Sequence, residues 1–296
     1  MSGLLLVDKP AGMTSHDVVD HLRRATGIRR IGHTGTLDPN ATGLLVLCID
    51  KATRLSEHLT GLDKVYEGTM RLGITTTSYD LDGELVEERP VPELTLQQIQ
   101  DVCNRYIGDI EQIPPMVSAV KVGGERLYKI ARKGETVERK PRAVTVYEFT
   151  ALSYSPPDVI VRVACTSGTY VRGLCHDAGH DLGCGAVLAA LRRTKVGDFS
   201  IEDARPVEEF KTPEDVAARL LPMDKALTLP EVTVRASAMP ALMSGNTLGA
   251  PELRAACPVT EGWVQIKSER GRLLALGLAE ATDYGVVVQP KRVFGN

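Results

Sequence analysis

The stretch that most constrains this chain is residues 32–43, Gly-His-Thr-Gly-Thr-Leu-Asp-Pro-Asn-Ala-Thr-Gly. Its three glycines permit backbone conformations that other residues avoid, so the stretch predicts a shaped loop. Pro39 biases the preceding Asp38 towards an extended conformation. The apolar run at 44–49 that follows predicts a buried strand. The sequence therefore predicts a single carboxylate on a stiff loop, backed by the core of a sheet.

Two interpretations of Asp38 remain open from these residues. An Asp-Pro pair in a loop is usually part of an Asx-type turn that leads into a strand. Alternatively, the loop is a functional site, because His33 and Asp38 share it. In that case its glycines let a ligand approach the backbone closely, and its hydroxyls bind phosphate or bases.

Length and composition set broad limits. A chain of 296 residues that is 43% hydrophobic can build one large or two modest domains with a full core. Its net charge of −3 does not by itself indicate a protein that binds polyanions. The six cysteines include no Cys-x-x-Cys pair, which favours free buried thiols in a reducing cytoplasm. No apolar run reaches the roughly 18 residues that span a bilayer, and residues 1–7 are too short for a signal peptide, so we expect no membrane association.

Helix signals are clear at two places. Thr14 is a candidate N-cap for a helix that Gly27 should end. Thr95 is a candidate N-cap for a second helix, over 95–108. Other periodicities predict a strand at 3–7, a hairpin within 64–83, a strand at 159–166 and a helix at 171–182.

The helix that follows Ser167-Gly168-Thr169 carries an unusual cation. Arg172 lies in its first turn, off the apolar face, where the helix dipole disfavours positive charge. We therefore predict that Arg172 faces an anion, either a phosphate or the Asp38 carboxylate. His176 and His180 have the spacing of a metal-binding pair, but no third ligand is apparent, so we predict a solvated face and no metal site.

Positive charge is concentrated in one segment. Residues 121–142 hold eight basic and three acidic side chains, a net charge of +5 in a chain whose total is −3. A local basic surface on a mildly acidic protein suits a polyanion held in one groove. A solvated, lysine-rich loop is the alternative.

The C-terminal quarter has its own pattern. Residues 199–227 are acidic and interrupted by prolines, which predicts connecting helices and a linker. Short β-like runs then alternate with turns, at 231–234, 263–266, 273–276 and 286–288. They predict a small β-barrel of about 65 residues, in the size range of a minimal domain. We therefore divide the chain into domains at 1–228 and 229–296.

The chain also resembles a known family. Residues 32–43 match Gly-His-Thr-Gly-x-Leu-Asp-Pro-x-Ala-Thr-Gly, the central motif of the bacterial tRNA pseudouridine-55 synthases (TruB type). Residues 9–15, Lys-Pro-Ala-Gly-Met-Thr-Ser, resemble the first motif of that family, and residues 167–172, Ser-Gly-Thr-Tyr-Val-Arg, resemble its third. The resemblance runs from Gly3 to about Lys195, with the motifs in the same order.

This resemblance implies an α+β fold. The catalytic domain would have a mixed, mainly antiparallel sheet with flanking helices, and the C-terminal β-barrel would be of the RNA-binding PUA type. The implied activity is isomerisation of the uridine at position 55, in the T-arm loop of tRNA, to pseudouridine after the base is flipped out. This reaction involves neither oxidation nor net hydrolysis, so we expect no cofactor and no metal. We expect a cytoplasmic monomer that needs no guide RNA or protein partner.

The resemblance also implies roles for single residues. Asp38 would be the nucleophile, and Arg172 its ion-pair partner, which favours the charged carboxylate. Tyr66, otherwise an ordinary strand aromatic that packs across a sheet, would lie against the target base and move the C5 proton. The implied substrate-binding residues are His33, which would enter the T-loop, with Tyr66, Tyr170 and Leu191 around the base.

The basic segment corresponds to an insertion at about 116–146 that would grip the tRNA. Its implied RNA-binding side chains are Lys121, Arg126, Arg132, Lys133 and Arg142. The chain departs from the family at Thr77, where relatives usually carry an aspartate. Asp80, Asp82 and Gly83 remain, so we expect the turn itself to be kept.

Three rival functions would fit parts of this sequence. A synthase acting on another RNA with a guide would carry extensions that we expect to be absent here. A non-catalytic RNA-binding or tRNA-folding protein on the same fold would not need Asp38, Tyr66 and Arg172 together. A phosphate-binding hydrolase would need a metal cluster or a base-activated serine or cysteine, and the sequence indicates neither. We therefore predict the tRNA synthase.

Overall fold

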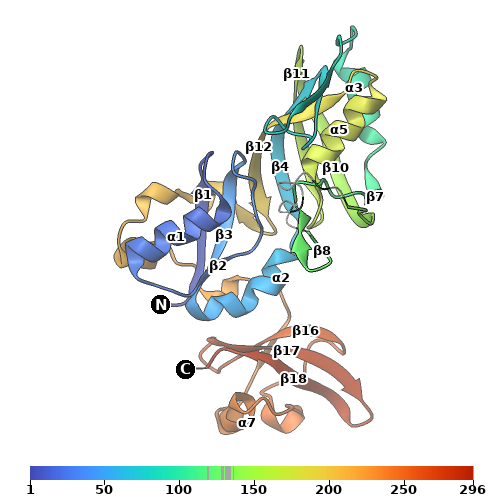
Figure 1. Cartoon of the computed structure of the whole chain (residues 1–296). Helices are drawn as coiled ribbons and strands as arrows, with labels where there is room; N and C mark the ends of the chain where they lie inside the picture. The colour runs from blue at the N-terminus through green and yellow to red at the C-terminus, as the bar shows by residue number, and fades with distance from the viewer. Residues whose placement is uncertain (119, 128–129, 131–134, 136, 296) are drawn as a thin grey trace.

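The computed structural model describes residues 1–118, 120–127, 130, 135 and 137–295. These residues form one large sheet, a separate C-terminal sheet and two short two-stranded ribbons. Figure 1 shows the large sheet extending across the upper part of the molecule, with the C-terminal sheet below it. The predicted α+β class is therefore confirmed.

The large sheet is mixed and mainly antiparallel, as predicted. Its strands are β1 (Gly3–Lys9), β2 (Ile31–His33), β3 (Thr42–Ile49), β4 (Lys64–Leu72), β7 (Gly108–Gln112), β10 (Arg142–Ser155), β11 (Asp158–Cys165), β12 (Ala186–Val196), β13 (Phe199–Ser200) and β14 (Arg205–Pro206). Their order is β14-β1-β3-β12-β4-β11-β10-β7, with β2 paired to β3 and β13 paired to β12. The β1–β14 and β12–β3 contacts are parallel.

Three helices cover parts of this sheet: α1 (Ser15–Thr26), α3 (Leu96–Asn104) and α5 (Val171–Asp181). As predicted, Thr14 and Thr95 cap α1 and α3 in reciprocal capping boxes. Gly27 ends α1 in the left-handed conformation, with φ 70°. The second helix ends four residues earlier than predicted, because Gly108 already begins β7.

The hairpin predicted within residues 64–83 is wrong. β4 pairs with β11 and β12, which come from much later in the chain. Residues beyond Gly73 form a separate ribbon of β5 (Ile74–Thr76) and β6 (Leu85–Glu88). The sequence analysis also missed β10 and β12, whereas the strands predicted at the start of residues 64–83 and at 159–166 correspond to β4 and β11.

Between the two sheets the chain follows the predicted pattern of short connecting elements. They include α6 (Pro213–Arg219), which begins at a proline and is capped by Thr212, and the two-residue strand β14. None of the helices in the described part of the chain has the length and apolar character needed to cross a membrane.

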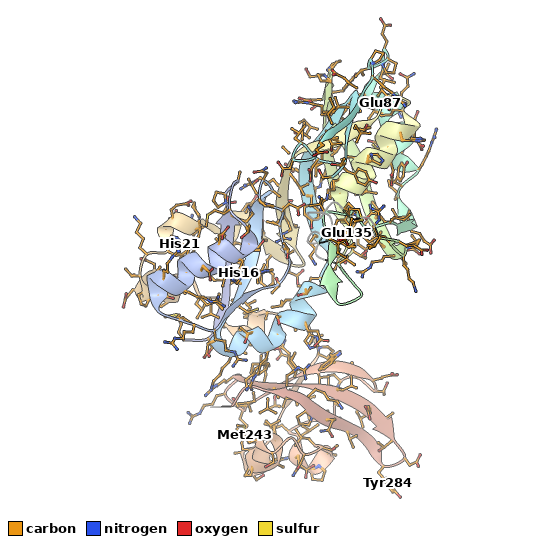
Figure 2. All side chains as sticks on the ribbon, in the orientation of Figure 1. His16, His21, Glu87, Glu135, Met243 and Tyr284 are labelled. Atoms are coloured by element: carbon orange, nitrogen blue, oxygen red, sulfur yellow. The ribbon has the colours of Figure 1, made fainter. Side chains whose placement is uncertain are left out.

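The C-terminal sheet consists of β15 (Glu231–Thr233), β16 (Gly262–Lys267), β17 (Leu273–Thr282) and β18 (Gly285–Val293), paired in that order. The four predicted β-like runs all fall on these strands. Within the described residues the sheet is open, so the predicted closed barrel is not found. Figure 2 shows Tyr284 at the end of this region that points away from the large sheet, with Met243 of helix α7 (Met239–Met243) also on its outer side.

One buried apolar cluster spans the two sheets. Leu276 and Phe294 of the C-terminal region belong to the same buried cluster as Leu4, Val46 and Phe199. His58 packs edge-on against the Trp263 ring, with ring centroids 4.4 Å apart, at the border of this cluster. The C-terminal sheet is therefore packed against the large sheet and not merely tethered to it.

Candidate active site

A pocket of about 250 Å³ lies where the 32–43 loop, β4, β12 and the start of α5 meet. Five residues predicted for the site line it: Asp38, Tyr66, Tyr170, Arg172 and Leu191. The fold thus brings together side chains from four separate parts of the sequence. His33 lies on β2, half-buried, and is not in the lining of this pocket.

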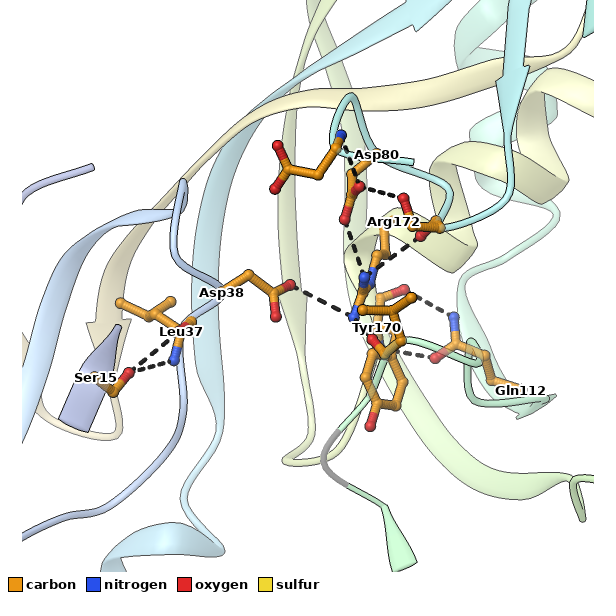
Figure 3. A network of polar contacts seen from close by, with 10 residues as sticks. Ser15, Leu37, Asp38, Asp80, Gln112, Tyr170 and Arg172 are labelled. Atoms are coloured by element: carbon orange, nitrogen blue, oxygen red, sulfur yellow. Dashed lines mark hydrogen bonds and ion pairs between the residues drawn. The ribbon is translucent and has the colours of Figure 1, made fainter. Parts of the chain in front are cut away.

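The loop that carries Asp38 is held by its backbone. The buried Lys9 ammonium donates hydrogen bonds to the carbonyls of Pro10 at 2.8 Å, Met13 at 2.6 Å and Pro39 at 2.9 Å. On the other side of Asp38, the Ser15 hydroxyl accepts from the Leu37 N–H at 2.8 Å and donates to the Leu37 carbonyl at 3.2 Å (Figure 3). Clamped at both flanking residues, Asp38 is presented by a rigid turn.

The glycines of this loop contribute unequally. Gly43 alone among them has a positive φ, of 102°. A Cβ at Gly43 would lie 2.3 Å from the Arg193 carbonyl oxygen, so the close approach of β3 and β12 requires glycine there. Two of the threonine hydroxyls serve the fold instead of a ligand, since Thr34 donates to the Val46 carbonyl and Thr42 to the Leu191 carbonyl.

Arg172 is the centre of a charged network (Figure 3). Its Nη2 lies 3.6 Å from Oδ2 of Asp38, and its Nη1 lies 3.0 Å from Oδ2 of Asp80. It also donates to the carbonyls of Ser78 and Val117. The prediction that this first-turn arginine faces an anion is confirmed, and the Asp38 carboxylate is one of two that it faces. Its side chain is only 4% exposed, because it enters the space between these partners.

Asp80 is one of the site residues that the sequence analysis missed. Beyond its contact with Arg172, it accepts hydrogen bonds from the Ser78 hydroxyl and from the Asp82 N–H at 3.1 Å. The sequence showed Asp80 only as part of a retained turn, and nothing in the local pattern indicates that its carboxylate reaches α5. At Thr77, the hydroxyl accepts from the Glu84 N–H at 3.1 Å, so this residue closes the turn.

The histidine pair of α5 does not form a common site. The His176 ring stacks on the Tyr79 ring at a centroid distance of 3.9 Å, so it is half-buried and does not belong to the predicted solvated face. The His180 side chain is 84% exposed. The stack places His176 directly beneath the turn that carries Asp80.

Tyr170 is fixed immediately before α5. Its N–H donates to Oε1 of Gln112 at 2.7 Å, and its carbonyl accepts from Nε2 of Gln112 at 2.9 Å (Figure 3). The Arg172 guanidinium carbon lies 5.7 Å from the centroid of the Tyr170 ring. Tyr170 thus provides a half-buried aromatic surface beside the carboxylate network, at a distance suited to a cation–π contact.

Burial and neighbouring charges act in opposite directions on the pKa of Asp38. The Asp38 side chain is 49% exposed, and it lines the concave pocket. Removal from bulk water raises the pKa of Asp38; the Arg172 charge opposes this and the Asp80 charge adds to it. Arg172 is thus the group that favours the ionised form of a poorly solvated carboxylate, and a carboxylate nucleophile or base needs that form.

The basic segment begins at the edge of this pocket. Ser118 lines the pocket, and Lys121 and Arg126 then lie opposite each other in the ribbon of β8 (Lys121–Val122) and β9 (Glu125–Arg126). Arg142 is exposed at the start of β10. Arg132 and Lys133 lie outside the described residues.

Comparison with known proteins agrees with the geometry. Residues 23–171 match the family model of the TruB family pseudouridylate synthase (N terminal domain), and residues 172–228 match that of the tRNA pseudouridylate synthase B C-terminal domain. A curated relative from Opitutus terrae, named tRNA pseudouridine synthase B, is 51% identical over 229 residues, which cover 76% of this chain and 95% of the relative. One of the same name from Pseudomonas aeruginosa is 41% identical over 300 residues, covering 99% and 96%.

Solved structures show the same architecture. A chain of an H/ACA RNP bound to a substrate RNA containing 2'-deoxyuridine is 28% identical, with a TM-score of 0.77, over 99% of this chain and 85% of that one. A chain of a Cbf5-Nop10-Gar1 complex is 30% identical, with a TM-score of 0.75, over 99% and 84%. Because one family model spans half of the sequence, and a relative at 41% identity covers nearly all of it, this chain belongs to the TruB family of pseudouridylate synthases.

Proposed function

We propose that this chain converts a uridine of tRNA, at position 55 in the T-arm loop, to pseudouridine with Asp38 as the nucleophile. The single observation that carries this assignment is the Asp38 carboxylate, half-exposed in a concave pocket and 3.6 Å from a buried guanidinium. The names of the relatives, tRNA pseudouridine synthase B, support tRNA as the substrate.

The reaction rearranges bonds within one nucleotide. The bond from C1′ to N1 breaks, the bond from C1′ to C5 forms, one proton leaves C5 and one proton is taken up at N1. In this scheme Asp38 attacks the flipped nucleotide, and Arg172 holds the carboxylate ionised and aimed. Tyr66 and Leu191 pack on the base, and Tyr66 removes the C5 proton. Asp80 anchors Arg172 from the side opposite Asp38.

We propose RNA contacts on both sides of this pocket. The basic segment, with Lys121, Arg126, Arg132, Lys133 and Arg142, would hold phosphates, and His33 would enter the T-loop. We place a domain boundary after residue 228, where the second family-model match ends. The C-terminal sheet would then serve as a second RNA-binding element of the PUA type.

We further propose a cytoplasmic monomer that acts without a guide RNA. The five buried thiols favour a reducing compartment. One structural neighbour named above comes from an H/ACA RNP and the other from a Cbf5-Nop10-Gar1 complex, whereas the curated relatives are named tRNA pseudouridine synthase B.

The direct test is turnover of a T-arm stem-loop by the purified chain, measured as pseudouridine. The same stem-loop with a cytidine at the target position is the matched control. A chain that binds the stem-loop tightly but forms no pseudouridine would indicate the non-catalytic alternative.

A further inference from the structure

A second buried arginine lines the same pocket as Arg172. Arg193 of β12 is the residue directly opposite Tyr66 of β4 in their antiparallel pair. Its side chain is 2% exposed, and it donates from Nε to the Leu44 carbonyl at 2.7 Å and from Nη2 to the Gly35 carbonyl at 3.1 Å. Arg193 thus ties the Asp38 loop to the strand that carries Leu191.

In the part of the chain that the structure describes, no carboxylate forms an ion pair with Arg193. Arg172, by contrast, pairs with Asp38 and Asp80, and Arg192 pairs with Asp8. Burying a guanidinium against neutral carbonyls costs free energy that a carboxylate partner would offset. Because Arg193 also lines the pocket, its charge is available to a group inside the pocket.

Other buried cations reinforce this positive charge. Lys64, at the start of β4, donates to the Thr60 carbonyl at 2.7 Å and also to the Leu62 carbonyl. Burial, together with the Arg193 charge, lowers the pKa of Lys64 to about 8. Lys9 is shifted in the same way, to about 8, with Asp38 opposing the shift. This side of the pocket is therefore suited to an anion.

The Tyr66 side chain lies beside Arg193, because the two residues face each other across the β4–β12 pair and both line the pocket. The Arg193 charge favours the phenolate. Burial raises the pKa of Tyr66 above its usual value, and the groups that face it from β11 and from the loop, Cys165 and Asp38, act in the same direction. Arg193 is therefore the cation that opposes this rise.

We propose that Arg193 is a positioning residue for Tyr66, orienting its phenolic oxygen and stabilising the phenolate that removes the C5 proton. This inference rests on the proposed function. In the step concerned, the phenolate takes the proton from C5 of the rejoined base, the C5–H electron pair becomes the C5–C6 double bond, and the C6–N1 double-bond pair moves to N1, which takes up a proton. The phenolate thereby becomes a phenol. Water supplies the proton for N1, and the phenol returns its proton to water, so no proton is gained or lost overall.

A double-mutant cycle tests this coupling. Arg193→Met and Arg193→Lys are made in the wild-type chain and in Tyr66→Phe, and single-turnover rates are measured on the T-arm stem-loop. If Arg193 acts through the phenol, Arg193→Met slows the wild type by about tenfold or more but changes Tyr66→Phe by less than about twofold. Arg193→Lys keeps the charge, so its single-turnover rate should lie between those of wild type and Arg193→Met. Equal losses in both backgrounds would overturn the inference.

Arg192→Met is the matched control. Arg192 neighbours Arg193 on β12 but pairs with Asp8 at 2.7 Å, and it does not line the pocket. We expect its single-turnover rate to stay within about twofold of wild type, because its charge does not reach Tyr66. Circular dichroism melts of all variants separate a local effect from unfolding.

A second measurement needs no turnover. A fluorinated tyrosine placed at position 66 titrates at lower pH than tyrosine, and its fluorine NMR signal reports its ionisation. Arg193→Met should move this titration to higher pH by about one unit or more, and Arg193→Lys by less. An unchanged midpoint in both variants would overturn the inference. A wild-type chain that forms no pseudouridine would instead overturn the proposed function, while this titration would still decide whether Arg193 acts on Tyr66.

Discussion

The Nη2 atom of Arg172 lies 3.6 Å from Oδ2 of Asp38, and the two residues differ sharply in their exposure. The guanidinium is buried, whereas the carboxylate faces the pocket. Burying a charged pair costs desolvation energy, so the contact is weak evidence for a role in stability. The contact runs from the protein interior to a carboxylate that opens on to the pocket, and this direction favours a role in catalysis.

Replacing Asp38 tests the nucleophile. Asp38→Asn removes the charge but keeps the shape, so pseudouridine formation should fall below detection while RNA affinity changes by no more than a few-fold. Filter binding and a pseudouridine assay on the same preparation give the two values. Appreciable turnover by this variant would show that another group attacks the nucleotide.

Replacing Arg172 tests control of the Asp38 pKa. Burial raises this pKa and Arg172 lowers it, so the ionised form needed for attack is lost as the pH falls. Arg172→Ala should slow turnover strongly and shift the acidic limb of the rate profile to higher pH. Arg172→Lys keeps the charge without the planar fork, so it should fold, bind and turn over slowly. An acidic limb of Arg172→Ala identical to that of wild type would exclude pKa control.

Replacing Asp80 should shift the acidic limb of the rate profile in the opposite direction. Its charge raises the pKa of Asp38, so Asp80→Asn should move the acidic limb to lower pH. Turnover should still fall by about tenfold, because Arg172 loses the carboxylate that it contacts at 3.0 Å. Asp101→Asn, on the exposed side of α3, is the matched control and should behave as wild type. An acidic limb of Asp80→Asn that moves to higher pH would contradict this arrangement of charges.

The basic segment should contribute to the salt dependence of binding. Charge reversal at Arg132 and Lys133 should lower RNA affinity and flatten the plot of log affinity against log salt, because fewer counterions are released. The rate at which bound RNA is converted to pseudouridine should change much less. If the slope stays the same, the segment is solvated and makes no phosphate contacts.

Gly43 tests the junction that supports the site. Gly43→Ala would place a methyl group 2.3 Å from the Arg193 carbonyl oxygen at a positive φ, so we expect the free energy of unfolding to drop by about 2 kcal/mol or more. Gly32→Ala, in the same motif, meets its nearest atom at 4.0 Å and is the control. Urea titrations of both variants give the comparison. Equal stabilities would mean that β3 and β12 adjust easily.

Local signals were sufficient for part of this fold. Thr14, Thr95 and Gly27 were predicted correctly because a capping residue and a helix end depend on only a few neighbours. The pairing of β4 depends on strands that lie more than 80 residues later, and no local pattern specifies that choice. The hairpin prediction failed for this reason.

The candidate site, like the fold, was predicted only in part. The resemblance to a family indicated Asp38 and Arg172, and the helix-dipole argument gave Arg172 an anionic partner. Asp80 and Arg193 were not predicted, because each looks ordinary in its own segment, as a turn residue and as one of two adjacent arginines. Their importance arises only from burial and from contacts across the sheet.

The shared core of the two sheets has a mechanical consequence. With Leu276 and Phe294 embedded among Leu4, Val46 and Phe199, the C-terminal sheet cannot swing without exposing apolar surface. The packing of this cluster therefore fixes the distance between the pocket and the C-terminal sheet. An RNA that touches both must present its target base and its second contact at that spacing, which would restrict the RNA shapes that fit.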